Sequence, residues 1–156
     1  MANLGLGSQI TSKAGSGGSG TPTGVIVTHT TGSLAPGAIE NSTLTMAKSV
    51  SILAVEVSSS ARLRLYQTSA ARTADANRTN LTPPTPGTPH QVIGDWYLNG
   101  NANAPLIFWC SPPTPGQNAD GLTDGTQTTN IYAAITNLGT GSTAITATIF
   151  YVPTES

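Results

Sequence analysis

From Val25 onward, apolar and polar residues alternate over short runs separated by turn residues. Alternation of this kind is typical of β-strands with one buried face. The last run, TAITATIFYV, places Ile145, Ile149 and Tyr151 on one face and its threonines on the other, wetter face. We therefore expect strands at Val25–Thr30, Thr43–Ala47, Ser49–Val57, Ala61–Gln67, Gln91–Leu98, Leu106–Cys110, Asn130–Thr136 and Ala144–Val152.

Two segments depart from simple alternation. The run VSILAVEV, residues 50–57, is apolar on both faces, which indicates a central strand that is covered on both sides. The alanine-rich SAARTADA, residues 69–76, is the one helix candidate, and at that length it needs packing to persist. Short strands without a long helix predict an all-β protein, an antiparallel β-sandwich of about eight strands that is jelly-roll-like.

The N-terminal segment has a different composition. Between Gly7 and Gly24 it consists almost entirely of Gly, Ser, Thr, Lys and Ala, without hydrophobic periodicity, as flexible segments do. We divide the chain into an arm at residues 1–24 and a sandwich domain at residues 25–156. The arm is either a disordered tail or a segment that becomes ordered along a neighbouring subunit, with Leu4, Leu6 and Ile10 as apolar anchors.

A proline-rich sequence occurs twice, as TPPTPG at residues 82–87 and as SPPTPG at residues 111–116. Between the two copies lie two expected strands joined through Asn99-Gly100, a dipeptide typical of hairpin turns. In such a hairpin both proline loops emerge at one end of the sandwich, either as stiff contact loops or as rigid connectors. The candidate contact residues are Pro83, Pro84, Pro86, Pro112, Pro113 and Pro115.

Charge is scarce. Charged residues make up 8% of the 156 residues and the formal net charge is -1, whereas about a quarter of an average soluble chain is charged. Such a chain has no general attraction to nucleic acid or to an acidic membrane, and its weakly charged surface suits packing into a larger assembly. No secretion signal or membrane span is recognisable, so we expect a protein that is made, and soluble, in the cytoplasm of its host cell.

Sequence motifs for catalysis and for metal binding are missing. The histidines are His29 and His90, no GxSxG or HExxH sequence occurs, and the single cysteine, Cys110, has no partner. The loop NADGLTDG, residues 118–125, fails the EF-hand pattern and fits Asx-Gly turns better. We expect no enzyme activity, no catalytic residue, no metal and no cofactor.

Aromatic residues gather in the expected hairpin, where Trp96, Tyr97, Phe108 and Trp109 lie. Aromatic side chains at such positions usually belong to the core. The alternative is a carbohydrate-binding module, in which Trp96 and Trp109 stack on the sugar rings of a host glycan.

All four arginines fall within ARLRLYQTSAARTADANR, residues 61–78. In the strand ARLRLY the two arginines share one face, which is open to solvent or to a subunit contact. On a helical turn Asp75 stands between Arg72 and Arg78 and bridges both, and its charge favours a structural clamp over a phosphate site. The residues of this clamp are Arg62, Arg64, Arg72, Asp75 and Arg78.

Three segments together suggest a family: SLAPG at residues 33–37, the run at residues 48–78 that contains ARLRLY and AARTAD, and the closing run at residues 131–152. They resemble a group of small structural proteins and modules of tailed bacteriophages, including phages of cyanobacteria. In that group an ARxRLY strand precedes an AARxAD turn, and a hairpin closes the chain. The proline-rich residues 82–116 depart from the pattern. Residues that match it are Arg62, Arg64, Leu65, Tyr66, Arg72, Asp75 and Arg78.

The resemblance implies a component of the virion. We expect a structural protein that docks through its N-terminal arm onto other virion proteins, either in the tail, baseplate or fibre or on the capsid as a decoration or cement protein. We also expect it to form a homo-oligomer, with a trimer favoured.

Overall fold

The computed structural model describes residues 23–78, 82, 91–99 and 105–155. It is an all-β sandwich of two four-stranded antiparallel sheets with one short helix, as the sequence predicted. The elements are β1 (Val25–Thr30), β2 (Ile39–Thr45), β3 (Ser49–Val57), β4 (Ala61–Tyr66), α1 (Ser69–Ala74), β5 (Val92–Leu98), β6 (Leu106–Gln117), β7 (Asn130–Asn137) and β8 (Thr146–Pro153).

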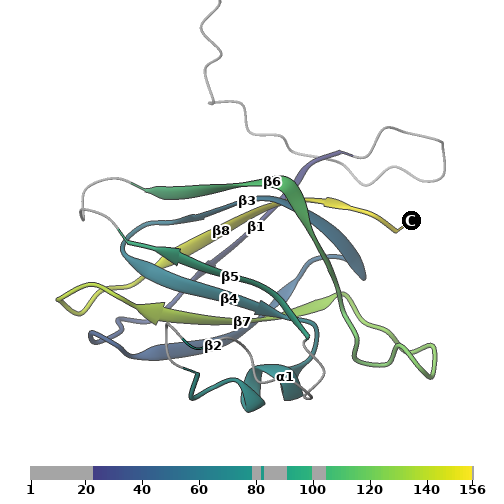
Figure 1. The fold of residues 1–156 in the computed structure, drawn as a ribbon, viewed down its shortest axis with the longest axis horizontal. Helices are drawn as coiled ribbons and strands as arrows, with labels where there is room; N and C mark the ends of the chain where they lie inside the picture. The colour runs from purple at the N-terminus through teal and green to yellow at the C-terminus, as the bar shows by residue number, and fades with distance from the viewer. Residues whose placement is uncertain (1–22, 79–81, 83–90, 100–104, 156) are drawn as a thin grey trace, which may run out of the picture.

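The strand order is that of a jelly roll. One sheet runs β1-β8-β3-β6 and the other runs β2-β7-β4-β5 (Figure 1). The first strand pairs with the last, the second with the seventh, the third with the sixth and the fourth with the fifth. The chain is therefore a long antiparallel ribbon that has been wound into two layers.

The core lies between the two sheets. β4 contributes Leu63 and Leu65, which are fully buried, and β7 contributes Ile131 and Ile135 beside them. The faces expected for β8 are confirmed, because Ile145, just before the strand, and Ile149 and Tyr151 within it are buried, whereas its threonines and Phe150 are partly exposed.

A bulge explains why β3 is apolar at both odd and even positions. The register of β3 with both of its neighbours shifts between Ile52 and Ala54. An extra residue reverses the alternation, so Val50 and Ile52 before the bulge and Val55 and Val57 after it all enter the same core. The expected central position of β3 is confirmed, since it lies between β8 and β6.

The hairpin expected around Asn99-Gly100 is wrong. β5 and β6 belong to different sheets, so the chain crosses from one layer to the other between them. The second proline-rich sequence, residues 111–116, is also not a loop, because β6 continues through it to Gln117. The inference of a common end for two proline loops therefore loses its basis, and Pro83, Pro84 and Pro86 of the first copy lie outside the described residues.

The helix α1 starts where the sequence predicts and is shorter. Thr68 caps it by accepting a hydrogen bond from the backbone N–H of Ala71 at 3.0 Å, and the helix ends at Ala74. It contacts β4 and β7 on the side of their sheet that faces away from the core. In the part of the chain that is described, no helix has the length and apolar character that crossing a membrane requires.

Candidate functional site

The two outer faces of the sandwich are the candidate surfaces. We call the outer face of β2-β7-β4-β5 the closed face, because α1 and residues 75–78 cover its central strands, while Ile39 and Tyr97 on its edge strands stay about half exposed. We call the outer face of β1-β8-β3-β6 the open face. The core-directed positions of β4 are Leu63 and Leu65, so alternation turns Arg62, Arg64 and Tyr66 toward the closed face.

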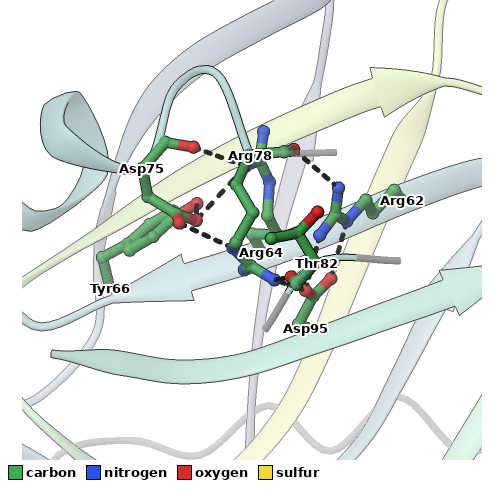
Figure 2. Close-up of polar contacts among 7 residues, drawn as sticks. All are labelled: Arg62, Arg64, Tyr66, Asp75, Arg78, Thr82 and Asp95. Atoms are coloured by element: carbon green, nitrogen blue, oxygen red, sulfur yellow. Dashed lines mark hydrogen bonds and ion pairs between the residues drawn. The ribbon is translucent and has the colours of Figure 1, made fainter. Parts of the chain in front are cut away.

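Asp75 joins the covering turn to the sheet on the closed face. Its Oδ2 accepts hydrogen bonds from the hydroxyl of Tyr66 at 2.6 Å and from Nη1 of Arg64 at 3.2 Å. Its Oδ1 accepts one from Nε of Arg78 at 2.6 Å (Figure 2). Arg64 also donates to the backbone oxygen of Asp75 at 3.0 Å. The strand and the turn are therefore connected by hydrogen bonds to one carboxylate.

A second carboxylate, Asp95 on β5, extends the network. Arg62 donates from Nε and Nη2 to the two oxygens of Asp95, at 2.8 and 2.7 Å, in the bidentate geometry that guanidinium and carboxylate groups favour. Nη1 of Arg78 lies 2.7 Å from Oδ2 of Asp95, so Arg78 bridges both aspartates. We call Arg62, Arg64, Tyr66, Asp75, Arg78 and Asp95 the arginine cluster.

The guanidinium groups of the cluster are buried and outnumber its carboxylates. Arg62, Arg64 and Arg78 are 3%, 1% and 8% exposed, and two carboxylates face these three guanidinium groups. The expectation that Arg62 and Arg64 face solvent or another subunit is wrong, because the chain itself covers them. Because charges are held away from water here, each cation depends strongly on its remaining partners.

The cluster shifts the titration of its acids. Burial alone would raise the pKa of Asp75, yet hydrogen bonds from Arg78 and Tyr66 outweigh it and hold that pKa below its ordinary value. Burial is likewise outweighed at Asp95, where hydrogen bonds from Arg62 and Arg78 lower the pKa. Burial and the hydrogen bond to Asp75 raise the pKa of Tyr66, so its phenol stays protonated and donates.

Arg72 lies apart from this cluster. Its Nη1 donates to the backbone oxygen of Ser42 on β2 at 2.6 Å, and its guanidinium lies 5.4 Å from the centre of the Tyr132 ring. Of the two bridges that sequence spacing suggested, the one from Asp75 to Arg78 is present, and no ion pair joins Asp75 to Arg72 among the described contacts. Asp95 was missed because its pairing with β4 joins residues about thirty positions apart in the chain.

The open face carries an apolar row. Ile26 on β1 is paired with Phe150 on β8, Phe150 with Ala54 on β3, and Ala54 with Trp109 on β6. Ile26 is 50% exposed and Trp109 is 60% exposed, whereas Ala54 between the larger side chains is covered completely. We call these four residues the apolar row. The next row holds Thr28, Thr148, Glu56 and Ile107.

The apolar row ends at an edge strand. Within the described chain β6 has β3 on one side and no strand on the other. Its first half exposes three consecutive large apolar residues, Ile107, Phe108 and Trp109, and has neither a proline nor a charge. Exposed apolar edges usually mark a contact with another chain, because natural proteins otherwise protect them with charges or prolines.

The aromatic residues are divided between core and surface. Trp96 is 7% exposed and its ring lies against Gly94, where an added Cβ atom would come within 2.1 Å of it. Its burial confirms the core interpretation for Trp96 and contradicts a glycan-stacking role for that residue. The core interpretation is wrong for Tyr97, Phe108 and Trp109, which are half or more exposed.

The prolines of β6 lie in its second half. Pro112, Pro113 and Pro115 are exposed, but in a strand and not in the contact loop that the sequence suggested. Proline has no backbone N–H to donate, so this half of the edge is protected against strand addition. β6 therefore has an unprotected first half and a protected second half.

The remaining candidate motifs have local partners. In the loop at residues 118–125, Asp124 accepts hydrogen bonds from the backbone N–H and the hydroxyl of Thr126, as an Asx turn does. His29 lies 2.9 Å from Glu40, and this pair connects the two sheets. Over residues 23–78, 82, 91–99 and 105–155, no group of three His, Cys, Asp or Glu side chains is placed to hold a metal ion.

Two shallow surface hollows are lined by uncharged residues. One, of about 350 Å³, lies between the start of β3 and the second half of β6. The other, of about 290 Å³, lies between residues 58–60 and residues 139–144. Serine, threonine and glycine are most of the lining of the second hollow and half of the first, and no titratable side chain lines either of them. Neither hollow offers the acid, base or nucleophile of an active site.

Comparison with known proteins gave no relative: the chain matches no protein-family model and no curated protein sequence.

Proposed function

We propose that this protein is a non-enzymatic structural component of a bacteriophage virion, attached to other virion proteins through its N-terminal arm. The observation that carries the proposal is the contrast between the two outer faces. At the centre of one face the chain itself covers buried, ion-paired arginines, and the other face ends in an exposed apolar edge strand. A molecule with such an edge is suited to contact other protein chains.

Two further properties support an assembly role. Three of the four arginines are buried in ion pairs with Asp75 and Asp95, so the surface carries fewer charged side chains than the low total suggests. The jelly roll recurs in viral capsid domains and in lectins, although a fold by itself does not assign a function. The resemblance of the ARLRLY and AARTAD segments to phage structural proteins favours the virion over other assemblies.

The position in the particle has two versions, which copy number separates. A decoration or cement protein binds the capsid lattice at many equivalent points, whereas a tail, baseplate or fibre protein occupies one axial site. Quantitative mass spectrometry of purified particles, with the major capsid protein as internal standard, measures the ratio. Hundreds of copies per particle exclude the tail version, and the complete absence of the protein from purified particles overturns the proposal.

A second candidate function is binding of a host glycan, and the exposure of Trp109 favours it. Its ring is 60% exposed beside a row of threonines and a carboxylate, as in surfaces that stack and hydrogen-bond sugar rings. On a glycan array, Trp109→Ala should abolish binding, while Tyr97→Ala, an exposed aromatic on the other sheet, should not. Absence of binding by the wild-type protein removes this candidate.

A further inference from the structure

The first half of β6 is an unfilled position for one more strand. The residues Leu106–Cys110 have one strand neighbour, β3, within the described chain. A strand added on the other side would pair its backbone with β6 and cover Ile107 and Trp109 on the open face. Because prolines occur at residues 112, 113 and 115, the pairing is limited to this first half.

The sequence that precedes the sandwich has the pattern that such an added strand needs. Leu4, Leu6 and Ile10 are all at even positions, so an extended backbone places them on one side. Cross-strand contacts of these side chains with Ile107 and Trp109 would bury apolar surface on both chains.

Charge also fits. Residues 1–22 contain one charged side chain, Lys13, and it is basic. The two central rows of the open face contain one charged side chain, Glu56, and it is acidic. An arm that lies across this face therefore meets a charge of opposite sign and none of like sign.

The place where the arm joins the sandwich favours a neighbouring copy. The arm precedes β1, and β1 and β6 are the opposite edges of the same sheet. A copy seated beside β1 of its neighbour would present β6 there, which is a head-to-tail contact, and such contacts form rings when the rotation between neighbours closes. Twenty-two residues reach at most about 70 Å when extended, and the sheet is only about 14 Å wide between these edges.

We propose that residues 1–22 of one copy add as a strand to Leu106–Cys110 of β6 in a neighbouring copy, and that this exchange of arms builds a closed ring. The proposal rests on the proposed function in that it identifies the surface that receives the arm. It makes the oligomer, and not the single chain, the unit that enters the assembly.

The experiment measures the mass of the full-length protein by light scattering after size exclusion. The wild-type protein is expected to be a ring oligomer. An arm variant, with Leu4→Ser, Leu6→Ser and Ile10→Ser, and an edge variant, with Ile107→Thr and Trp109→Thr, are each expected to lose the oligomer. Leu122→Ser, which removes an exposed apolar residue in the loop at residues 118–125, is the matched control and should remain oligomeric. Circular dichroism verifies that each variant is folded.

Mixing the arm variant with the edge variant identifies which segment binds to the edge of β6. The arm variant retains an intact β6 and the edge variant retains an intact arm, so an equal mixture should form a heterodimer with one productive contact. If the contact were instead a symmetric one between two open faces, no heterodimer would form. Each mixed pair would contain one edge variant, and the open face of that variant is altered. A monomeric wild-type protein, an oligomer that tolerates the arm variant, or a mixture without heterodimer each overturns the proposal.

Failure of this proposal is distinguishable from failure of the proposed function. A protein that is present in purified particles but does not exchange arms in solution remains a virion component and has a different docking surface. A ring that forms through the arms but is absent from the particles establishes the contact between copies. The same result overturns the proposal that the protein is a component of the virion.

Discussion

The two outer faces of the sandwich differ in which types of residue they bury and which they expose. The closed face has charged residues at its centre, where Arg62 and Arg64 are almost fully buried beneath the chain's own turn. The open face has apolar residues at its surface, with Ile26 and Trp109 half or more exposed. Residue type alone would have predicted the reverse, so exposure here depends on which segments the chain supplies as cover.

The two faces also differ in whether their residues find their partners within the same chain. On the closed face every cation of the arginine cluster has an acidic partner within the chain. On the open face the apolar row is not covered by any described segment. The arginine cluster needs no partner chain, whereas an apolar edge gains free energy when another chain covers it.

The largest expected effect concerns Asp75, and it tests whether the closed face depends on this carboxylate. Asp75→Ala leaves three cations with Asp95 as their one carboxylate and removes the acceptor of Tyr66. We expect a loss of about 3 kcal/mol in the free energy of unfolding, the low end of the cost of breaking a buried pair. Urea denaturation measures it, with Asp124→Ala in an exposed turn as the control that should change little.

Acid should weaken the same face. The pKa values of Asp75 and Asp95 are lowered in the folded protein, so the unfolded chain binds their protons first as the pH falls. Stability is therefore present above the pKa of the unfolded chain and is lost as the pH falls below about 4. Urea midpoints across this range should shift less in Asp95→Asn than in the wild type, whereas Glu56→Gln on the open face should retain the full shift. Equal shifts in both variants contradict this assignment.

A smaller effect is expected at Arg72, which borders the closed face without belonging to the arginine cluster. Arg72→Ala removes one hydrogen bond to Ser42 and the contact with the Tyr132 ring, so we expect a loss of about 1 kcal/mol. Thermal or urea denaturation measures it beside Lys48→Ala, an exposed basic residue. A loss as large as that of Asp75→Ala would place Arg72 in the cluster after all.

The smallest effect on the folded chain is expected on the open face. Trp109→Ala should change the free energy of unfolding by less than about 0.5 kcal/mol, because its ring is mostly in solvent. The other tryptophan is its matched control, since Trp96→Ala empties a core site and should cost about 3 kcal/mol. Both are measured by urea denaturation under conditions where the protein is monomeric. A large loss at Trp109 would mean that the open face is covered within the chain.

Much of the fold was predictable because strand patterns are local. β1 and β3 begin and end at the predicted residues, and the buried face of β8 follows from its alternation. The hairpin at Asn99-Gly100 failed because a turn dipeptide favours a reversal but does not determine which sheet receives the next strand. The prediction of a loop at the second proline-rich sequence was also wrong, because those residues belong to an edge strand, which tolerates prolines that a central strand does not.

The candidate surfaces were less predictable, because they depend on contacts between distant residues. The spacing of Asp75 and Arg78 is visible in the sequence, whereas Asp95 reaches Arg62 and Arg78 through the register of β4 with β5. The residues around Trp96 and Trp109 in the sequence do not indicate that Trp96 is buried and Trp109 is exposed. Both residues lie on edge strands, β5 and β6, and what separates them is the face of the strand: Trp96 packs into the core, whereas Trp109 lies on the open face.

The burial of every residue of β4 has a consequence for the motions of the chain. This strand lies between β5 and β7, with the core on one side and the arginine cluster on the other. Its backbone amides can exchange hydrogen with solvent only when the sandwich opens as a whole. Amides of β6 that point away from β3 are expected to exchange rapidly in isolated chains and to become protected once a neighbouring strand is added.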